Sequence, residues 1–170
     1  IQIYSNVAGR PLDLPEFVRI FAIMAKHGLP IWLHPARTAA MPDYATEARS
    51  RFEMWWCFGW PYETSVAMAR LVFCGVFDRY PALKIVTHHL GGMIPYFDGR
   101  IGPGMAFLGS RTAGEDHSHV LGSLKKPQLD YFKMFYADTA MFCGEYGLPS
   151  GRKVFGADHG VFAPEARFWR

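Results

Sequence analysis

Histidine and aspartate side chains recur directly after short runs of apolar residues. His34 ends PIWLH, the pair His88 and His89 ends KIVTHH, and Asp138 and Asp158 end FYAD and VFGAD. Such runs are typical of buried parallel strands, whose carboxyl ends meet at one edge of a sheet or barrel. Imidazole and carboxylate groups gathered there suit a divalent cation such as zinc, which activates water or polarises a carboxylate or carbonyl.

Each of these residues also has a purely structural interpretation. Taken alone, His34 is as readily a hydrogen-bonded core histidine as a ligand. Asp138 and Asp158 could each cap a helix or anchor a turn. Because successive strand residues point to opposite faces, only one of His88 and His89 can face a barrel interior unless the other leaves strand geometry.

Two further groups have weaker signals. His117 and His119 have the H-x-H spacing of a metal-binding strand, but the loop-like RTAGED precedes them and a helical segment follows, so we expect a surface helix start. Trp55, Trp56 and Trp60 could line a pocket for a flat unsaturated acid. Large aromatics more often pack in a core or at a subunit interface, which is the alternative use.

Strand-like and helical segments alternate along the chain, which indicates an α/β fold with parallel strands and right-handed crossovers. The predicted strands are IQIYS, PIWLHP, KIVTHH, MFYADT and KVFGAD, and the clearest predicted helices run over 13–27 and about 62–80. The segment after IQIYS lacks the G-x-G-x-x-G spacing of a nucleotide-binding open sheet. We therefore predict a partial (β/α)8 barrel.

Composition excludes several classes of partner. The chain of 170 residues has a net charge of only +3 with scattered basic residues, so we expect neither nucleic acid nor a membrane surface as a partner. Its three cysteines form no C-x-x-C pair, which favours reduced thiols in the cytoplasm. No run approaches the ~18–20 apolar residues that span a bilayer. We expect a soluble cytoplasmic protein.

Three segments carry a family resemblance. PIWLHPAR, ETSVAMARLVFCGVFDRYPALKIVTHHLGGMIPYFDGRI and YFKMFYADTAMF resemble the amidohydrolase-related family that includes aminocarboxymuconate-semialdehyde, γ-resorcylate and 5-carboxyvanillate decarboxylases. The resemblance implies a distorted barrel and a divalent metal, zinc first and manganese as the alternative. It implies non-oxidative decarboxylation of a small aromatic or unsaturated carboxylic acid, with hydrolysis as the alternative reaction. Family members are often dimers, so a homodimer is expected.

The resemblance also assigns roles to residues. His34 matches the metal ligand of the L-H-P motif. His89, which begins the H-L-G-G motif, matches the catalytic histidine that handles protons. His88 is then its outward or supporting neighbour, and Asp138 matches an acid on the seventh strand that is not a metal ligand.

The last metal ligand of the family is an aspartate after the final strand. If VFGAD is that strand, Asp158 is the ligand; if VFGAD ends a helix, Pro164 and Glu165 stand where the ligand should be. The family's H-x-H pair lies on its first strand, so we expect residues 1–170 to be the C-terminal part of a single barrel domain, with about three strands before Ile1. The rival hypothesis is that the chain alone is a non-catalytic fragment.

Overall fold

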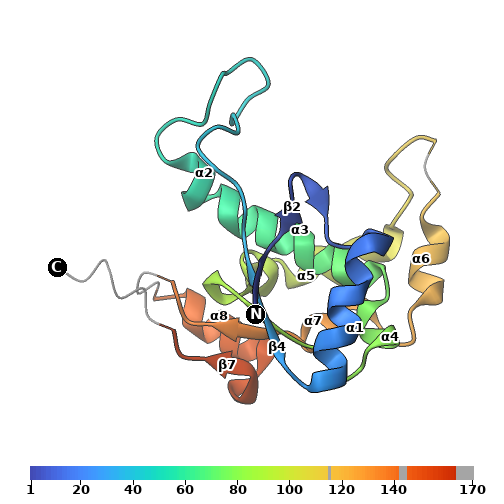
Figure 1. Ribbon diagram of the computed structural model, residues 1–170. Helices are drawn as coiled ribbons and strands as arrows, with labels where there is room; N and C mark the ends of the chain where they lie inside the picture. Colours follow the sequence, from blue (N-terminus) through green and yellow to red (C-terminus); the bar gives the residue numbers. More distant parts are fainter. Residues whose placement is uncertain (115, 142–144, 164–170) are drawn as a thin grey trace.

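The computed structural model describes residues 1–114, 116–141 and 145–163 and has a parallel sheet at its centre (Figure 1). Its five strands are β1 (Gln2–Tyr4), β4 (Pro30–His34), β5 (Lys84–Thr87), β6 (Tyr136–Asp138) and β7 (Gly160–Val161), in that order across the sheet. Each pairs in parallel with the next strand across the sheet. A small antiparallel hairpin, β2 (Asn6–Val7) and β3 (Arg10–Pro11), follows β1. This sequential order is that of a barrel segment and confirms the predicted fold class.

Helices fill the connections between the strands. They are α1 (Val18–His27), α2 (Met54–Cys57), α3 (Gly59–Phe73), α4 (Val76–Arg79), α5 (Asp98–Ile101), α6 (Ser118–Ser123), α7 (Gln128–Phe132) and α8 (Gly147–Phe155). Short 3-10 turns are η1 (Pro15–Phe17), η2 (His89–Gly91), η3 (Ile94–Tyr96), η4 (Gly104–Phe107) and η5 (Ala157–His159). Of the helices in the described residues, none is long and apolar enough to cross a membrane.

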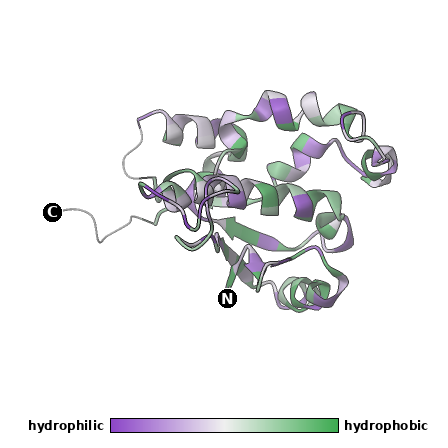
Figure 2. Ribbon diagram, turned by 90° about the horizontal axis from the view of Figure 1, so that it is seen from above, coloured by the Kyte–Doolittle hydropathy of each residue, from purple (hydrophilic) through white to green (hydrophobic). Residues whose placement is uncertain are grey.

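Alternate strand residues divide the sheet into two faces. Ile31 and Leu33 of β4 and Ile85 of β5 are almost completely buried in the core beneath the helices. Their neighbours Trp32 and His34 are only partly buried, because strand side chains alternate and these two point to the other face. That second face is the one that lines the interior in a barrel. The central strands are mainly hydrophobic (Figure 2).

The first helix shows how local sequence sets the element boundaries. Pro15 opens a 3-10 turn that leads into α1, and Gly28 ends the helix with φ 64°, a left-handed conformation that glycine adopts readily. Asp13, of a residue type that often caps helices, does not cap this one. Its carboxylate instead accepts two hydrogen bonds of 2.9 Å from Arg70, which join the start of α1 to α3.

The fifth predicted strand, KVFGAD, is wrong. Val154 and Phe155 end α8, and the strand β7 begins only at Gly160. Gly151 and Phe155, four residues apart, form the buried stripe of this helix, whereas Arg152 and Lys153 are exposed. A short apolar run fits a strand and a buried helix turn equally well, and here the four-residue spacing decides.

Candidate active site

Three imidazole rings meet at the carboxyl edge of the sheet. His34 ends β4, and His88 and His89 follow β5. The ring centres of His34 and His88 lie 4.9 Å apart, those of His34 and His89 5.6 Å, and those of His88 and His89 5.9 Å. The structure therefore brings together the three histidines that the sequence placed at strand ends.

A change of backbone conformation places both adjacent histidines on one side. His88 keeps an extended conformation, with φ −71° and ψ 159°. His89 and Leu90 both have φ 54°, and Gly91 and Gly92 continue the left-handed run at 75° and 63°. His89 thus leaves strand geometry, which was one of the two alternatives. His88 was expected to be an outward or a supporting neighbour of His89, and the outward alternative is wrong because the ring of His88 lies against that of His34.

The Nδ1 atom of His34 is already engaged. It lies 2.7 Å from the carbonyl oxygen of Pro35, the distance of a hydrogen bond. A neutral imidazole that donates from Nδ1 leaves Nε2 as the acceptor or ligand. Burial, partly offset by the Pro35 carbonyl, lowers the pKa of His34.

Asp138 lies behind His88. It is completely buried, and its Oδ1 accepts a 3.2 Å hydrogen bond from the Ala140 backbone N–H. Its Oδ2 lies 2.7 Å from Nδ1 of His88, although the angles of this contact fall short of hydrogen-bond geometry. It is a close polar contact. Asp138 therefore serves both as a turn anchor and as the partner of a site histidine.

His89 lies against Trp60. The two rings are nearly parallel, 23° apart in plane, with centres separated by 5.3 Å. Burial lowers the pKa of His89 to about 4; the Asp138 carboxylate raises it by a smaller amount, and His34 and His88 lower it slightly further. An imidazole with this pKa is neutral at pH 7 and can accept a proton. Trp60 is held in place because its Nε1 donates a 2.9 Å hydrogen bond to the Arg37 carbonyl.

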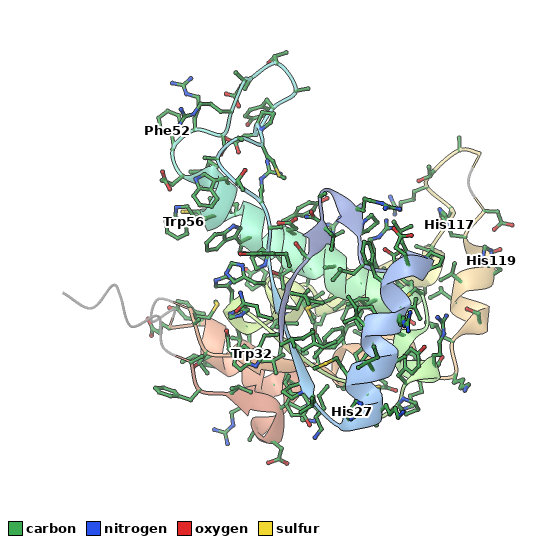
Figure 3. The ribbon with its side chains drawn as sticks, in the orientation of Figure 1. His27, Trp32, Phe52, Trp56, His117 and His119 are labelled. Carbon is green, nitrogen blue, oxygen red and sulfur yellow. The ribbon has the colours of Figure 1, made fainter. Side chains whose placement is uncertain are left out.

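The other two tryptophans surround Trp60. Trp55 meets it edge-on with ring centres 5.3 Å apart, and Trp56 lies 6.4 Å away. Nε1 of Trp56 donates a 2.6 Å hydrogen bond to Glu53. Trp56 lies at the base of the segment that projects from the body of the molecule (Figure 3). Trp55 and Trp56 contact Trp60, and Trp60 contacts His34 and His89. Trp55 and Trp56 therefore lie at the rim of the site.

Sequence reasoning missed two residues that build the site. Oε2 of Glu63 on α3 accepts hydrogen bonds from the backbone N–H groups of Ala36 (2.9 Å) and Arg37 (2.6 Å), just after His34. The ring of Trp32 lies 5.4 Å from that of His88. Trp32 precedes His34 by two residues on β4, so the alternation of strand side chains could have predicted that both lie on the same face of the sheet. No spacing in the sequence marks Glu63.

Asp158 lies away from the three histidines. It is exposed in η5, ahead of β7, and therefore lies at the amino end of a strand whose carboxyl end faces the site. Its predicted position at a strand end is wrong because VFGAD ends a helix, and the alternative position at Pro164 and Glu165 lies outside the described residues. His117 and His119 are exposed at the start of α6, far from Trp32 (Figure 3), as expected for a surface helix start.

The described residues supply part of a metal site. Across 1–114, 116–141 and 145–163, no three His, Cys, Asp or Glu side chains gather closely enough to hold a metal ion. His34 and His88 nevertheless form a pair in which Nδ1 of His34 lies 2.7 Å from the Pro35 carbonyl and Nδ1 of His88 lies 2.7 Å from the Asp138 carboxylate. Nε2 of His88 is buried without a hydrogen-bond partner in this part of the chain. Such a pair suits two positions of a metal site. A cavity of about 900 Å³ between α3 and η3–η4 is lined by other residues and contains none of the three histidines.

Sequence comparison places this fold and site in a family. The family model for amidohydrolases matches residues 1–113, and the chain belongs to that family. It is 38% identical over 104 residues to a 2-amino-3-carboxymuconate-6-semialdehyde decarboxylase of Dictyostelium discoideum, which covers 59% of this chain and 27% of the relative. It is 29% identical over 171 aligned positions to a gamma-resorcylate decarboxylase of Polaromonas, which covers 96% of this chain and 48% of the relative.

Solved structures agree with this placement. The 5-carboxyvanillate decarboxylase of Sphingomonas paucimobilis superposes with a TM-score of 0.79 at 26% identity, over 99% of this chain and 48% of that one. The IDCase of Metarhizium anisopliae gives a TM-score of 0.79 at 27% identity, over 99% and 44%. The chain thus spans about half the length of these structures or less. Its α/β fold corresponds to part of a (β/α)8 barrel in a decarboxylase-like branch of the amidohydrolases.

Proposed function

We propose that the protein is a divalent-metal-dependent, non-oxidative decarboxylase of a small aromatic or unsaturated carboxylic acid. The observation that carries the proposal is the convergence of His34, His88 and His89 beside Trp60 at the carboxyl edge of a parallel sheet. That edge is where barrel enzymes place their chemistry. The names of the relatives, which are decarboxylases of aromatic and muconate acids, support the reaction class.

His34 would hold the metal through Nε2, since its Nδ1 is engaged by Pro35. When bound, a divalent cation would hold the carboxylate of the substrate or an adjacent oxygen and stabilise negative charge there. Zinc and manganese both accept imidazole and carboxylate ligands, and a Polaromonas dihydroxybenzoic acid decarboxylase 26% identical to this chain has been solved with manganese. The remaining ligands would come from outside the described residues.

His89 would handle the proton of the reaction. Decarboxylation breaks the bond between the carboxyl group and the substrate carbon, releases carbon dioxide and leaves that carbon to take up a proton. His89 is neutral at pH 7, so it can accept a proton from solvent and pass it to this carbon. The flat face of Trp60 and the rim formed by Trp55 and Trp56 would bind a planar substrate.

The test compares this chain with a version extended upstream of Ile1 to the length of its relatives. Bound metal and carbon dioxide release from γ-resorcylate, 5-carboxyvanillate and 6-methylsalicylate are measured on both, with added zinc or manganese. We expect activity in the extended form and weaker metal binding in the chain alone, because the described residues do not complete a site.

The His89→Asn variant of the extended form should keep its metal and lose carbon dioxide release by at least ~10²-fold, the usual contribution of general acid–base catalysis. The matched control is His119→Asn, which changes an exposed histidine far from the site. Hydrolysis of a lactone or amide without carbon dioxide release would instead identify a hydrolase of the same superfamily. Absence of metal from both forms would favour a non-catalytic scaffold.

A further inference from the structure

We propose that Glu63 is a positioning residue of the site, and that its carboxylate sets the orientation of His34 and Trp60 through the backbone of the loop after β4. This inference rests on the decarboxylase function proposed above, in which His34 holds the metal and Trp60 lies against the proton-handling His89. Glu63 lies on α3, and its effect on the rings passes through the loop.

The Glu63 carboxylate binds two consecutive peptide groups. Its Oε2 accepts hydrogen bonds from the backbone N–H groups of Ala36 (2.9 Å) and Arg37 (2.6 Å). Oγ of Ser5, directly after β1, shares the Ala36 N–H at 3.0 Å, and Oε1 of Glu63 accepts a 2.7 Å hydrogen bond from the Asn6 side chain. Hydrogen bonds to a carboxylate are stronger than those between neutral groups, so both peptide planes are fixed relative to α3.

The first of these peptide groups orients His34. The N–H of Ala36 and the carbonyl of Pro35 belong to one planar peptide group. Its N–H binds Glu63, and its carbonyl oxygen lies 2.7 Å from Nδ1 of His34, so a rotation of this peptide would break both contacts at once. Hydrogen bonds in a chain also polarise one another, so the carboxylate strengthens the carbonyl as an acceptor. Glu63 therefore favours the proton on Nδ1 of His34 and leaves Nε2 for the metal.

The Arg37 contact extends the effect to the tryptophan. The Arg37 N–H binds Glu63, and the Arg37 carbonyl accepts the 2.9 Å hydrogen bond from Nε1 of Trp60. Trp60 and Glu63 lie three residues apart on α3, so they hold the loop from one face of the helix. Trp60 meets His34 edge-on, with ring centres 5.1 Å apart, and stacks on His89 at 5.3 Å. One carboxylate thus controls contacts that orient both His34 and the ring beneath His89.

Three variants of Glu63 separate positioning from stability. Glu63→Ala removes the carboxylate, and Glu63→Asp keeps its charge but withdraws it by one methylene group. Glu63→Gln keeps a side-chain oxygen that can accept both backbone N–H groups. The matched control is Asp13→Ala, which removes a different carboxylate contact of α3, the pair of hydrogen bonds from Arg70.

Nitrogen-15 NMR of this chain reads the site without any assay of activity. We expect the wild type to carry the His34 proton on Nδ1. Glu63→Ala and Glu63→Asp should shift the Trp60 indole N–H resonance and give a mixture of His34 tautomers, whereas Glu63→Gln and Asp13→Ala should keep the wild-type signals. Wild-type signals in folded Glu63→Ala would overturn the proposal. Equal shifts in Asp13→Ala would overturn it too, because they would come from a general loosening of α3.

A measurement on the wild type covers variants that do not fold, which circular dichroism would reveal. NMR couplings across hydrogen bonds should join the Ala36 and Arg37 amides to the carboxyl carbon of Glu63. Their presence would support the proposal, and their absence would refute it.

Kinetics of the version extended upstream of Ile1 test the role in the reaction. Glu63→Ala should lower kcat by ~10–10²-fold with a much smaller change in KM, because misplacement of a catalytic group by ~1 Å can cost ~10²-fold. Asp13→Ala should keep the wild-type kcat. An unchanged kcat in Glu63→Ala would rule out the positioning role and leave the proposed function intact. If the extended wild type releases no carbon dioxide from any substrate, the proposed function fails, whereas the NMR comparison still decides whether Glu63 orients the rings.

Discussion

Burial of the imidazoles sets the charge of the site. His89 stacks on Trp60, and burial lowers its pKa to about 4, against 6.5 for an exposed histidine. The pKa of His34 is lowered for the same reason. Because burial disfavours the charged form of an imidazole, the folded protein favours the neutral forms of His34 and His89.

The lowered pKa of His89 predicts a pH dependence of stability. Between pH 6.5 and about 4 the unfolded chain binds a proton at this residue and the folded chain does not, so the free energy of unfolding falls as pH falls through this window. This stability is fully present at pH 7, and its loss near pH 4 should amount to about 2–3 kcal/mol after allowance for partial exposure. Urea unfolding from pH 4.5 to 7 measures it.

The matched comparison uses His89→Asn and His119→Asn. The first should show a weaker fall in stability with falling pH than the wild type, and the second, which changes an exposed histidine, should follow the wild type. Equal slopes for all three proteins would contradict the low pKa of His89.

Residue types and spacing were enough to predict that His34, His88, His89 and Asp138 gather at one edge. Their roles were less predictable, because two adjacent strand residues normally point to opposite faces. The left-handed conformation of His89, which brings both rings together, has no signal in its own side chain; only the glycines after it hint at an unusual turn.

The left-handed turn from His89 to Gly92 positions the site against α3. A Cβ atom added to Gly92 would lie 2.4 Å from the Pro61 carbonyl oxygen and 2.9 Å from Oγ of Ser65, so the turn and the helix are in close contact. Ser65 also accepts a 2.8 Å hydrogen bond from the Met93 backbone N–H. The turn depends on glycine for both its conformation and its packing.

Gly92→Ala should therefore destabilise the protein by more than about 2 kcal/mol, from the positive φ together with the steric clash. Gly28→Ala is the matched control: Gly28 also has a positive φ, but its added Cβ would meet nothing within 4 Å. We expect this control to cost only about 1 kcal/mol. Chemical denaturation of the two variants gives the difference, and equal losses would show that packing against α3 is unimportant.

Glu63 connects three elements. Its carboxylate accepts hydrogen bonds from the loop after β4, at Ala36 and Arg37, and from the Asn6 side chain at 2.7 Å. Glu63→Ala leaves two backbone N–H groups without their acceptor and should cost about 1–3 kcal/mol. Glu16→Ala, which breaks only the exposed pair with Arg10, should cost less than about 1 kcal/mol. Thermal unfolding of both variants tests this, and comparable losses would contradict it.

Four of the five strands could be located from sequence, because β-branched and aromatic runs bounded by proline, glycine or polar residues identify buried strands. The last strand could not, since β7 is only two residues long and follows a helix end that is just as apolar. The predicted helix over about 62–80 is in fact two helices, because Gly75 interrupts it with φ 72°.

At the scale of the whole molecule, five parallel strands in sequential order form part of a barrel. The long segment through THHLGG was sufficient to predict the family, and the match of the family model to residues 1–113 confirms this prediction. The metal site could not be completed from sequence or structure, because a barrel site draws ligands from several strands and the described residues contribute only some of them.

Metal should stabilise the whole chain by mass action. A cation that binds only the folded state adds about 2.7 kcal/mol at a concentration of 100 times its Kd. For a domain of this size the Tm should then rise by roughly 5–10 °C. Differential scanning fluorimetry with zinc or manganese measures the rise, and the His34→Ala variant and added calcium serve as controls. An equal rise in His34→Ala would show that the metal binds elsewhere.

The contacts of Glu63 also have a consequence for the timing of local motion. Ala36 and Arg37 lie in an irregular loop, where amide hydrogens usually exchange with solvent quickly. Their amides, however, are held by a side chain anchored on α3. Their deuterium uptake should therefore be as slow as that of the helix itself, so that a loop next to the site opens only when α3 does.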